Sequence, residues 1–208
     1  MKKLIALLLN VAMLIGMMSA ALAYDEEITW QGLPWESSAE EVVQFLLDNE
    51  IISAESEFRL FDSGIEYFSF ITNKGKESKF KKDYTREEWL NATIGSYIDP
   101  ESMQIGGYNV RQVFFHFVRD GESEKLISIV IQFDSNSFDK KDMKNKINSV
   151  YGKKWIGANN TAVLLVEQGI WGYNYLIYSR TDAAKMIKEA FKHVPAEPTV
   201  DPNNTNGI

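Results

Sequence analysis

The stretch VRQVFFHFVRDGESEKLISIVIQF, residues 110–133, decides the fold of this chain. Its two ends, 110–118 and 126–133, are rich in Val, Ile and Phe, which favour extended backbone. Asp120-Gly121 lies between them, and this dipeptide is typical of the turn of a hairpin. Since a hairpin joins antiparallel strands, we expect the two ends to pair antiparallel within a sheet.

Further strand signals lie on both sides of this hairpin. Alternation with a period of two predicts strands at 58–61 and 65–71, joined by a turn at Asp62-Ser63-Gly64. Two more strands are expected at about 161–167 and 171–179. The sheet should therefore receive strands from before and after the central hairpin.

Three longer helices are predicted from apolar residues that recur at helical spacing. In helix 38–49 they stand at i, i+3, i+4, i+7 and i+8, and Ser37 or Ser38 forms a capping box with the glutamate three residues later. Helix 138–151 follows a Ser137 cap and stops at Gly152, with an inner face of Met143, Ile147, Val150 and Tyr151. The third helix spans about 182–193, and a short one starts at the capping box 85–88.

These elements together indicate an α+β fold with an antiparallel sheet. Strand hairpins with interspersed amphipathic helices favour this class over alternating βαβ units. We expect two layers, in which helices 38–49 and 138–151 cover one face of the sheet. The order helix, strand, strand follows both Ser37 and Ser137, so the pattern also suggests a diverged internal duplication.

The first 23 residues have the features of a secretory signal peptide. Lys2 and Lys3 precede an apolar run from Leu4 to Met18, and Ala21-Leu22-Ala23 forms a cleavage site after Ala23. The alternative is an N-terminal membrane anchor, for which the apolar run is short. We expect a secreted or periplasmic protein without a stable membrane span, with one domain at 24–194 and a disordered tail at 195–208.

Composition excludes several classes of site. The chain has no Cys, which excludes disulfides, Cys-ligated zinc, iron–sulfur clusters and a thiol nucleophile. Its net charge of −7 argues against nucleic acid, whose phosphates require a basic surface. The two histidines, His116 and His193, stand in no metal or catalytic pattern, and residues 134–145 lack the Gly and Glu of a calcium loop. We therefore expect no metal and no cofactor.

One segment carries a resemblance to a known group of exported proteins. Residues 32–42, GLPWESSAEEV, and a helix that ends in Val150-Tyr151-Gly152 resemble the β-lactamase-inhibitor-like fold, which includes the small lipoprotein of the outer-membrane assembly machinery. That resemblance implies helices on one face of an antiparallel sheet and a function in binding proteins. Because this chain has no lipoprotein Cys, the resemblance does not carry over a role in outer-membrane assembly.

Two functions from different classes fit the sequence. The first is an exported, non-catalytic module that binds a protein or an envelope component, and the second is a small exported hydrolase with carboxylate chemistry. The strands that carry the aromatic residues do not alternate cleanly between apolar and polar, so either both sheet faces are buried or one face is a recognition surface. The candidate residues for that surface are Phe114, His116, Trp171, Tyr173 and Tyr175. The basic segment 74–82 is either a solvated loop or a contact with anionic envelope polymer or lipid.

Overall fold

The computed structural model describes residues 24–53, 59–61, 88, 91–100, 102–121, 123–134, 138–167 and 172–193. These residues form an α+β fold with one antiparallel sheet, as the sequence predicts. The predictions for the signal peptide, the strand at 65–71, the basic segment 74–82, Trp171 and the tail at 195–208 lie outside the described residues.

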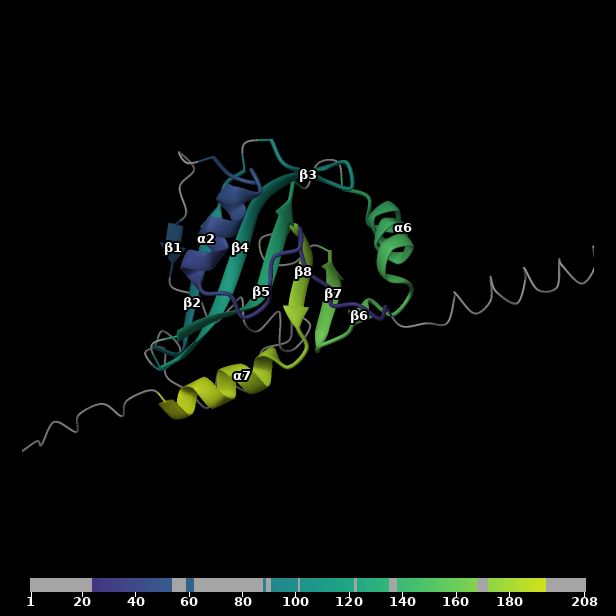
Figure 1. The fold of residues 1–208 in the computed structure, drawn as a ribbon. Helices are drawn as coiled ribbons and strands as arrows, with labels where there is room; N and C mark the ends of the chain where they lie inside the picture. Colours follow the sequence, from purple (N-terminus) through teal and green to yellow (C-terminus); the bar gives the residue numbers. More distant parts are fainter. Residues whose placement is uncertain are drawn as a thin grey trace, which may run out of the picture.

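The central hairpin consists of β4 (Tyr108–Asp120) and β5 (Ser123–Phe133), paired antiparallel from Asp120 and Ser123 onwards. Seven strands form a sheet in the order β1-β2-β4-β5-β8-β7-β6, and every one of these described pairs is antiparallel (Figure 1). The outer strands are β1 (Arg59–Phe61), β2 (Thr93–Ile98), β6 (Ile156–Gly157), β7 (Thr161–Val166) and β8 (Asn174–Arg180). The short β3 (Gln104–Ile105) pairs with the first residues of β4. Of these, β2, β3 and β6 are strands that the sequence patterns did not predict.

Helix α2 (Ala39–Asp48) confirms the prediction of a capped helix at 38–49. The Ser38 hydroxyl accepts the backbone N–H of Glu41, and the Glu41 carboxylate accepts the N–H of Ser38 in return, which satisfies two N–H groups of the first turn. Ser37 instead donates its hydroxyl to the carbonyl oxygen of Pro34. The capping box therefore uses the second of the two candidate serines.

Helix α6 (Lys140–Tyr151) differs from its prediction in two details. Its cap is Asp139, whose side chain accepts the N–H of Asp142, so the expected cap at Ser137 is wrong. Val150, predicted on the inner face, is 57% exposed, because α6 turns its Met143 and Ile147 side toward the sheet. The third predicted helix is α7 (Ala183–Ala190), followed by the 3-10 turn η2 (Phe191–His193). None of the helices that the structure describes combines the length and apolar character needed to cross a bilayer.

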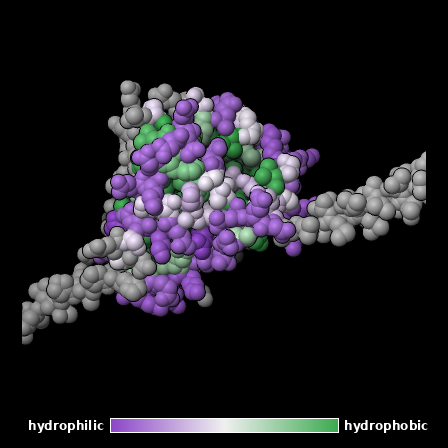
Figure 2. Space-filling view, in the orientation of Figure 1, coloured by the Kyte–Doolittle hydropathy of each residue, from purple (hydrophilic) through white to green (hydrophobic). Residues whose placement is uncertain are grey.

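The first face of the sheet, which carries Val113, Phe115 and Phe117, supports the main core. Helices α2 and α6 pack on it through Leu46 and Ile147, as expected from the sequence. The segment 24–36 also crosses this face and buries four apolar side chains, namely Ile28, Trp30, Leu33 and Trp35 (Figure 1). Figure 2 shows the hydrophobic surface on this side broken by hydrophilic residues into small separate areas.

The second face of the sheet carries the alternate residues of the same strands and is buried as well. At one end α7 packs through Ile187 on Val118 and Ile127. Further along, a separate apolar cluster contains Phe114, Val130, Tyr175 and Ile177. The failure of strict alternation in the sequence therefore reflects burial of both sheet faces. The structure does not confirm an internal duplication.

Candidate functional site

Four of the five residues predicted for partner binding are described by the structure, and the buried ones do not form an open surface. Phe114, His116 and Tyr175 are buried on the second face, and Tyr173, just before β8, is half-buried. Of the two alternatives left open by the sequence, burial of both sheet faces applies to Phe114, His116 and Tyr175, because in a sheet that is covered on both faces the inward aromatic residues of the central strands become core. Trp171 lies outside the described residues. A role of these residues in binding stays a prediction.

A row of small and polar residues crosses the second face between its two apolar clusters. Register pairs join Gly95 to His116, His116 to Ser128, Ser128 to Ser179, and Ser179 to Ala162. All five residues are buried. Burial lowers the pKa of His116 to about 3, so its imidazole is neutral at physiological pH. Among the described residues, the Ser128 hydroxyl has no hydrogen-bond partner.

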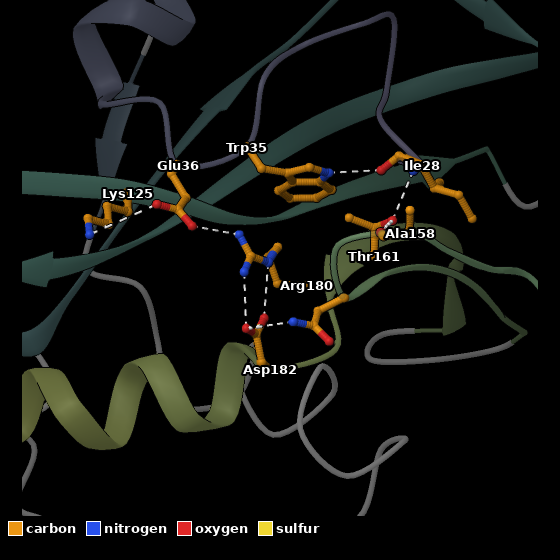
Figure 3. Close-up of polar contacts among 9 residues, drawn as sticks. Ile28, Trp35, Glu36, Lys125, Ala158, Thr161, Arg180 and Asp182 are labelled. Atoms are coloured by element: carbon orange, nitrogen blue, oxygen red, sulfur yellow. Dashed lines mark hydrogen bonds and ion pairs between the residues drawn. The ribbon is translucent and has the colours of Figure 1, made fainter. Parts of the chain in front are cut away.

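On the first face, Arg180 at the end of β8 holds a cluster of charged side chains. Its guanidinium donates two hydrogen bonds to Asp182, each 3.0 Å long, and one of 2.8 Å to Glu36 (Figure 3). Lys125 lies 4.0 Å from the other Glu36 oxygen, and the side-chain amide of Asn160 donates to Asp182. The Arg180 side chain is 12% exposed, so this forked geometry is partly shielded from solvent.

This cluster joins the N-terminal segment to the far end of the chain. Next to it the Trp35 indole donates to the carbonyl oxygen of Ile28, and the N–H of Ile28 donates to the Thr161 hydroxyl, at 2.8 and 2.9 Å (Figure 3). A Cβ added to Gly157 would lie 2.6 Å from the carbonyl oxygen of Glu26. Such close approach of two backbones requires glycine, so the sequence is adapted locally to hold this segment against β6 and β7.

A groove of about 360 Å³ lies between the strands β6, β7 and β8 and the start of α7. Ile156 pairs with Ala162, and Ala162 pairs with Ser179, so these side chains share the second face and belong to the outer end of the buried row. Leu164 extends the apolar side of the groove and Lys154 lies in its wall. The described lining contains no Asp or Glu. Its chemical character is therefore apolar and cationic.

Carboxylates elsewhere have structural partners. Asp142 accepts hydrogen bonds from Lys146 and Tyr108, which hold the pKa of its carboxyl below the usual value. A hydrogen bond from Lys192 likewise lowers the pKa of Glu189. Among the described residues, no three His, Cys, Asp or Glu side chains gather in a way that could hold a metal ion.

Sequence patterns did not identify the groove or the charged cluster. Glu36 and Arg180 are 144 positions apart, and no local spacing relates them. The one local signal near the groove is the Lys153-Lys154-Trp155-Ile156 run, in which cations stand beside large apolar residues directly after a helix.

Comparison with known proteins does not assign this arrangement. No protein-family model, no curated protein and no solved structure gives a significant match to this chain. Function is therefore inferred from the groove, the buried row and the charged cluster.

Proposed function

We propose that the chain is an exported, non-catalytic binding module of the bacterial envelope or extracellular space, and that it binds through the groove beside β7. The observation that carries this proposal is the lining of the groove. It combines the apolar side chains of Ile156 and Leu164 with Lys154, and its described residues include no carboxylate. Such a concave site, mostly apolar with a few polar groups, is typical of ligand-binding pockets.

Export is supported by the sequence features of the first 23 residues. A role in binding also agrees with the resemblance of residues 32–42 to the β-lactamase-inhibitor-like fold. The packing of α2 and α6 on one face of an antiparallel sheet is the arrangement that this resemblance implies.

The alternative, a hydrolase with carboxylate chemistry, has no comparable support. A general acid requires a carboxyl group in a concave site with a raised pKa. Among the described residues, hydrogen bonds lower the carboxyl pKa values of Asp142 and Glu189, and these two side chains lie on α6 and α7, outside the groove lining. His116 is buried and neutral, so it is poorly placed to exchange protons with a substrate in solvent.

Export is tested by the intact mass of the chain after expression in a bacterial host with a secretion pathway. The expected mass corresponds to a mature chain that begins at Tyr24, recovered from the periplasm or medium. A chain that retains Met1 and stays in the cytosol would refute export.

Binding is tested by site-specific photo-crosslinking on the exported chain. A benzophenone amino acid is placed at Ile156, which is 51% exposed in the groove wall, and at Lys188, which is exposed on α7 outside the described groove lining. We expect position 156, but not position 188, to form a discrete adduct with an envelope or extracellular component. The proposal is wrong if neither position forms an adduct or if both form the same set.

A further inference from the structure

We propose that the groove beside β7 binds a small amphipathic organic anion, with an apolar body and one acidic group, in which the acidic group contacts Lys154. This inference rests on the proposed binding function and adds the chemical class of the ligand. The position of Lys154, the apolar groove floor, the start of α7 and the buried row support it.

The apolar body is assigned from the groove floor and wall. Ala162 and Leu164 project from β7 on the second face, two residues apart, and Ile156 on β6 lies beside Ala162. Ile156 is 51% exposed, and among the described residues only Val150 is a comparably exposed large hydrophobic side chain. An apolar ligand over Ala162 and Leu164 would remove the Ile156 side chain from water, which is favourable in proportion to the area covered.

The acidic group of the ligand is inferred from the positive charge of Lys154 in the groove wall. The N–H of Val163 donates to the carbonyl oxygen of Trp155, which holds the turn before β6 against β7, and Lys154 in this turn lines the groove. Arg180 also lines the groove, but its guanidinium is directed to Glu36 and Asp182 on the first face. Among the described residues of the lining, Lys154 is thus the cation available to a ligand, in a chain whose net charge is −7.

The start of α7 adds a second source of positive potential to the groove lining. Asp182 precedes α7, but its carboxylate is held by Arg180 and Asn160 and makes no capping hydrogen bond. Ala183 and Ala184, the first two residues of α7, line the groove. Because the first N–H groups of a helix carry partial positive charge, this part of the lining, like Lys154, favours an anionic over a cationic ligand.

The buried row supplies a polar contact at the inner side of the groove. Ser179 lies in the groove lining and pairs in register with Ala162 on the same face. Its hydroxyl can bond a hydroxyl or carbonyl group of a ligand beside the apolar floor. This observation is independent of the charge on Lys154.

The groove volume restricts the size of the ligand. About 360 Å³ is near the lower end of the range for small-molecule pockets, which suits a two-ring aromatic or a medium-chain acid rather than a protein segment. Two dyes of the same ring system separate the apolar and anionic contributions. Anilinonaphthalene sulfonate carries one sulfonate, and N-phenyl-naphthylamine is its uncharged counterpart.

The test is fluorescence titration of both dyes with the mature protein and three folded variants. Lys154→Met should weaken binding of the sulfonate dye up to about fivefold, as for a solvent-exposed ion pair, and leave the neutral dye unchanged. Ala184→Leu fills the groove and should weaken both dyes. Lys188→Met removes the same charge from an exposed site outside the described groove lining and should change neither.

Circular dichroism first shows that each variant is folded, and Ala184→Val replaces Ala184→Leu if the latter unfolds. The ligand class is wrong if the wild type does not bind the sulfonate dye, or if Lys154→Met and Lys188→Met have equal effects. It is also wrong if filling the groove changes neither affinity. Crosslinking at Ile156 without dye binding would refute the ligand class and leave the binding function standing. Dye binding as expected without a crosslink would support the preference of the groove for an amphipathic anion and refute its binding of an envelope or extracellular component.

Discussion

Acidification from pH 7 to pH 5 is expected to destabilise this protein through His116. The folded state holds the pKa of His116 at about 3, because the ring is fully buried, whereas an unfolded histidine has a pKa of about 6.5. Below pH 6.5 the unfolded chain therefore binds a proton that the folded chain does not. Stability is present above pH 6.5 and is lost as the pH falls toward 3.

The magnitude follows from the two pKa values. Between pH 7 and pH 5 the difference in proton binding lowers the free energy of unfolding by about 2 kcal/mol. The chain contains one other histidine, His193. The assay is urea unfolding at both pH values, followed by tryptophan fluorescence, with the linear slope checked to be the same.

A matched pair of variants isolates the effect. His116→Phe should abolish most of the loss between pH 7 and pH 5, since its side chain does not titrate, whereas His193→Gln should keep it. Equal losses in the wild type and His116→Phe would refute the burial of an uncharged His116. If His116→Phe does not fold, the ring proton of His116 in the wild type is followed by nuclear magnetic resonance, and a midpoint near 6.5 would refute the same reasoning.

Three further predictions concern the packing of the N-terminal half. Leu46→Ala removes a fully buried side chain and should lower the free energy of unfolding, measured in urea, by about 2–5 kcal/mol. A loss below about 0.5 kcal/mol would contradict the assignment of Leu46 to the buried face of α2. Ser38→Ala should cost about 1 kcal/mol by the same assay and Ser37→Ala less, because only Ser38 belongs to the capping box; equal costs would contradict this. Gly157→Ala places a Cβ 2.6 Å from the carbonyl oxygen of Glu26 and should expose amides of residues 24–36 to faster hydrogen exchange; unchanged exchange would show that the two backbones separate without cost.

Local patterns in the sequence determined much of the secondary structure. The capping box and the helical spacing of apolar residues predicted α2, because both depend on neighbours within one turn. The β4–β5 hairpin followed from two β-branched and aromatic runs around Asp120-Gly121. In contrast, Thr93–Ile98 contains Gly95 and lacks alternation, so β2 was not predicted, and its place in the sheet comes from pairing with β4.

The burial of the predicted surface residues was decided by tertiary structure. Apolar residues on both sides of a strand are compatible with two covered faces or with one exposed recognition face, and the sequence pattern is the same in both cases. Phe114 and Tyr175 pack into a buried cluster on the second face. For these two residues the covered face is therefore the correct alternative, and the exposed recognition face is not. No local signal could do so, since the choice depends on which elements pack against the sheet.

The candidate site depends on the fold even more strongly. Composition alone predicted an acidic chain without cysteine chemistry, because charge and residue type do not depend on the fold. The groove requires Lys154 and Ile156 from one turn of the chain to lie beside Ala183 at the start of α7. Those segments meet because β7 pairs with both β6 and β8 at the sheet edge, and strand pairing joins residues without any fixed spacing in the sequence.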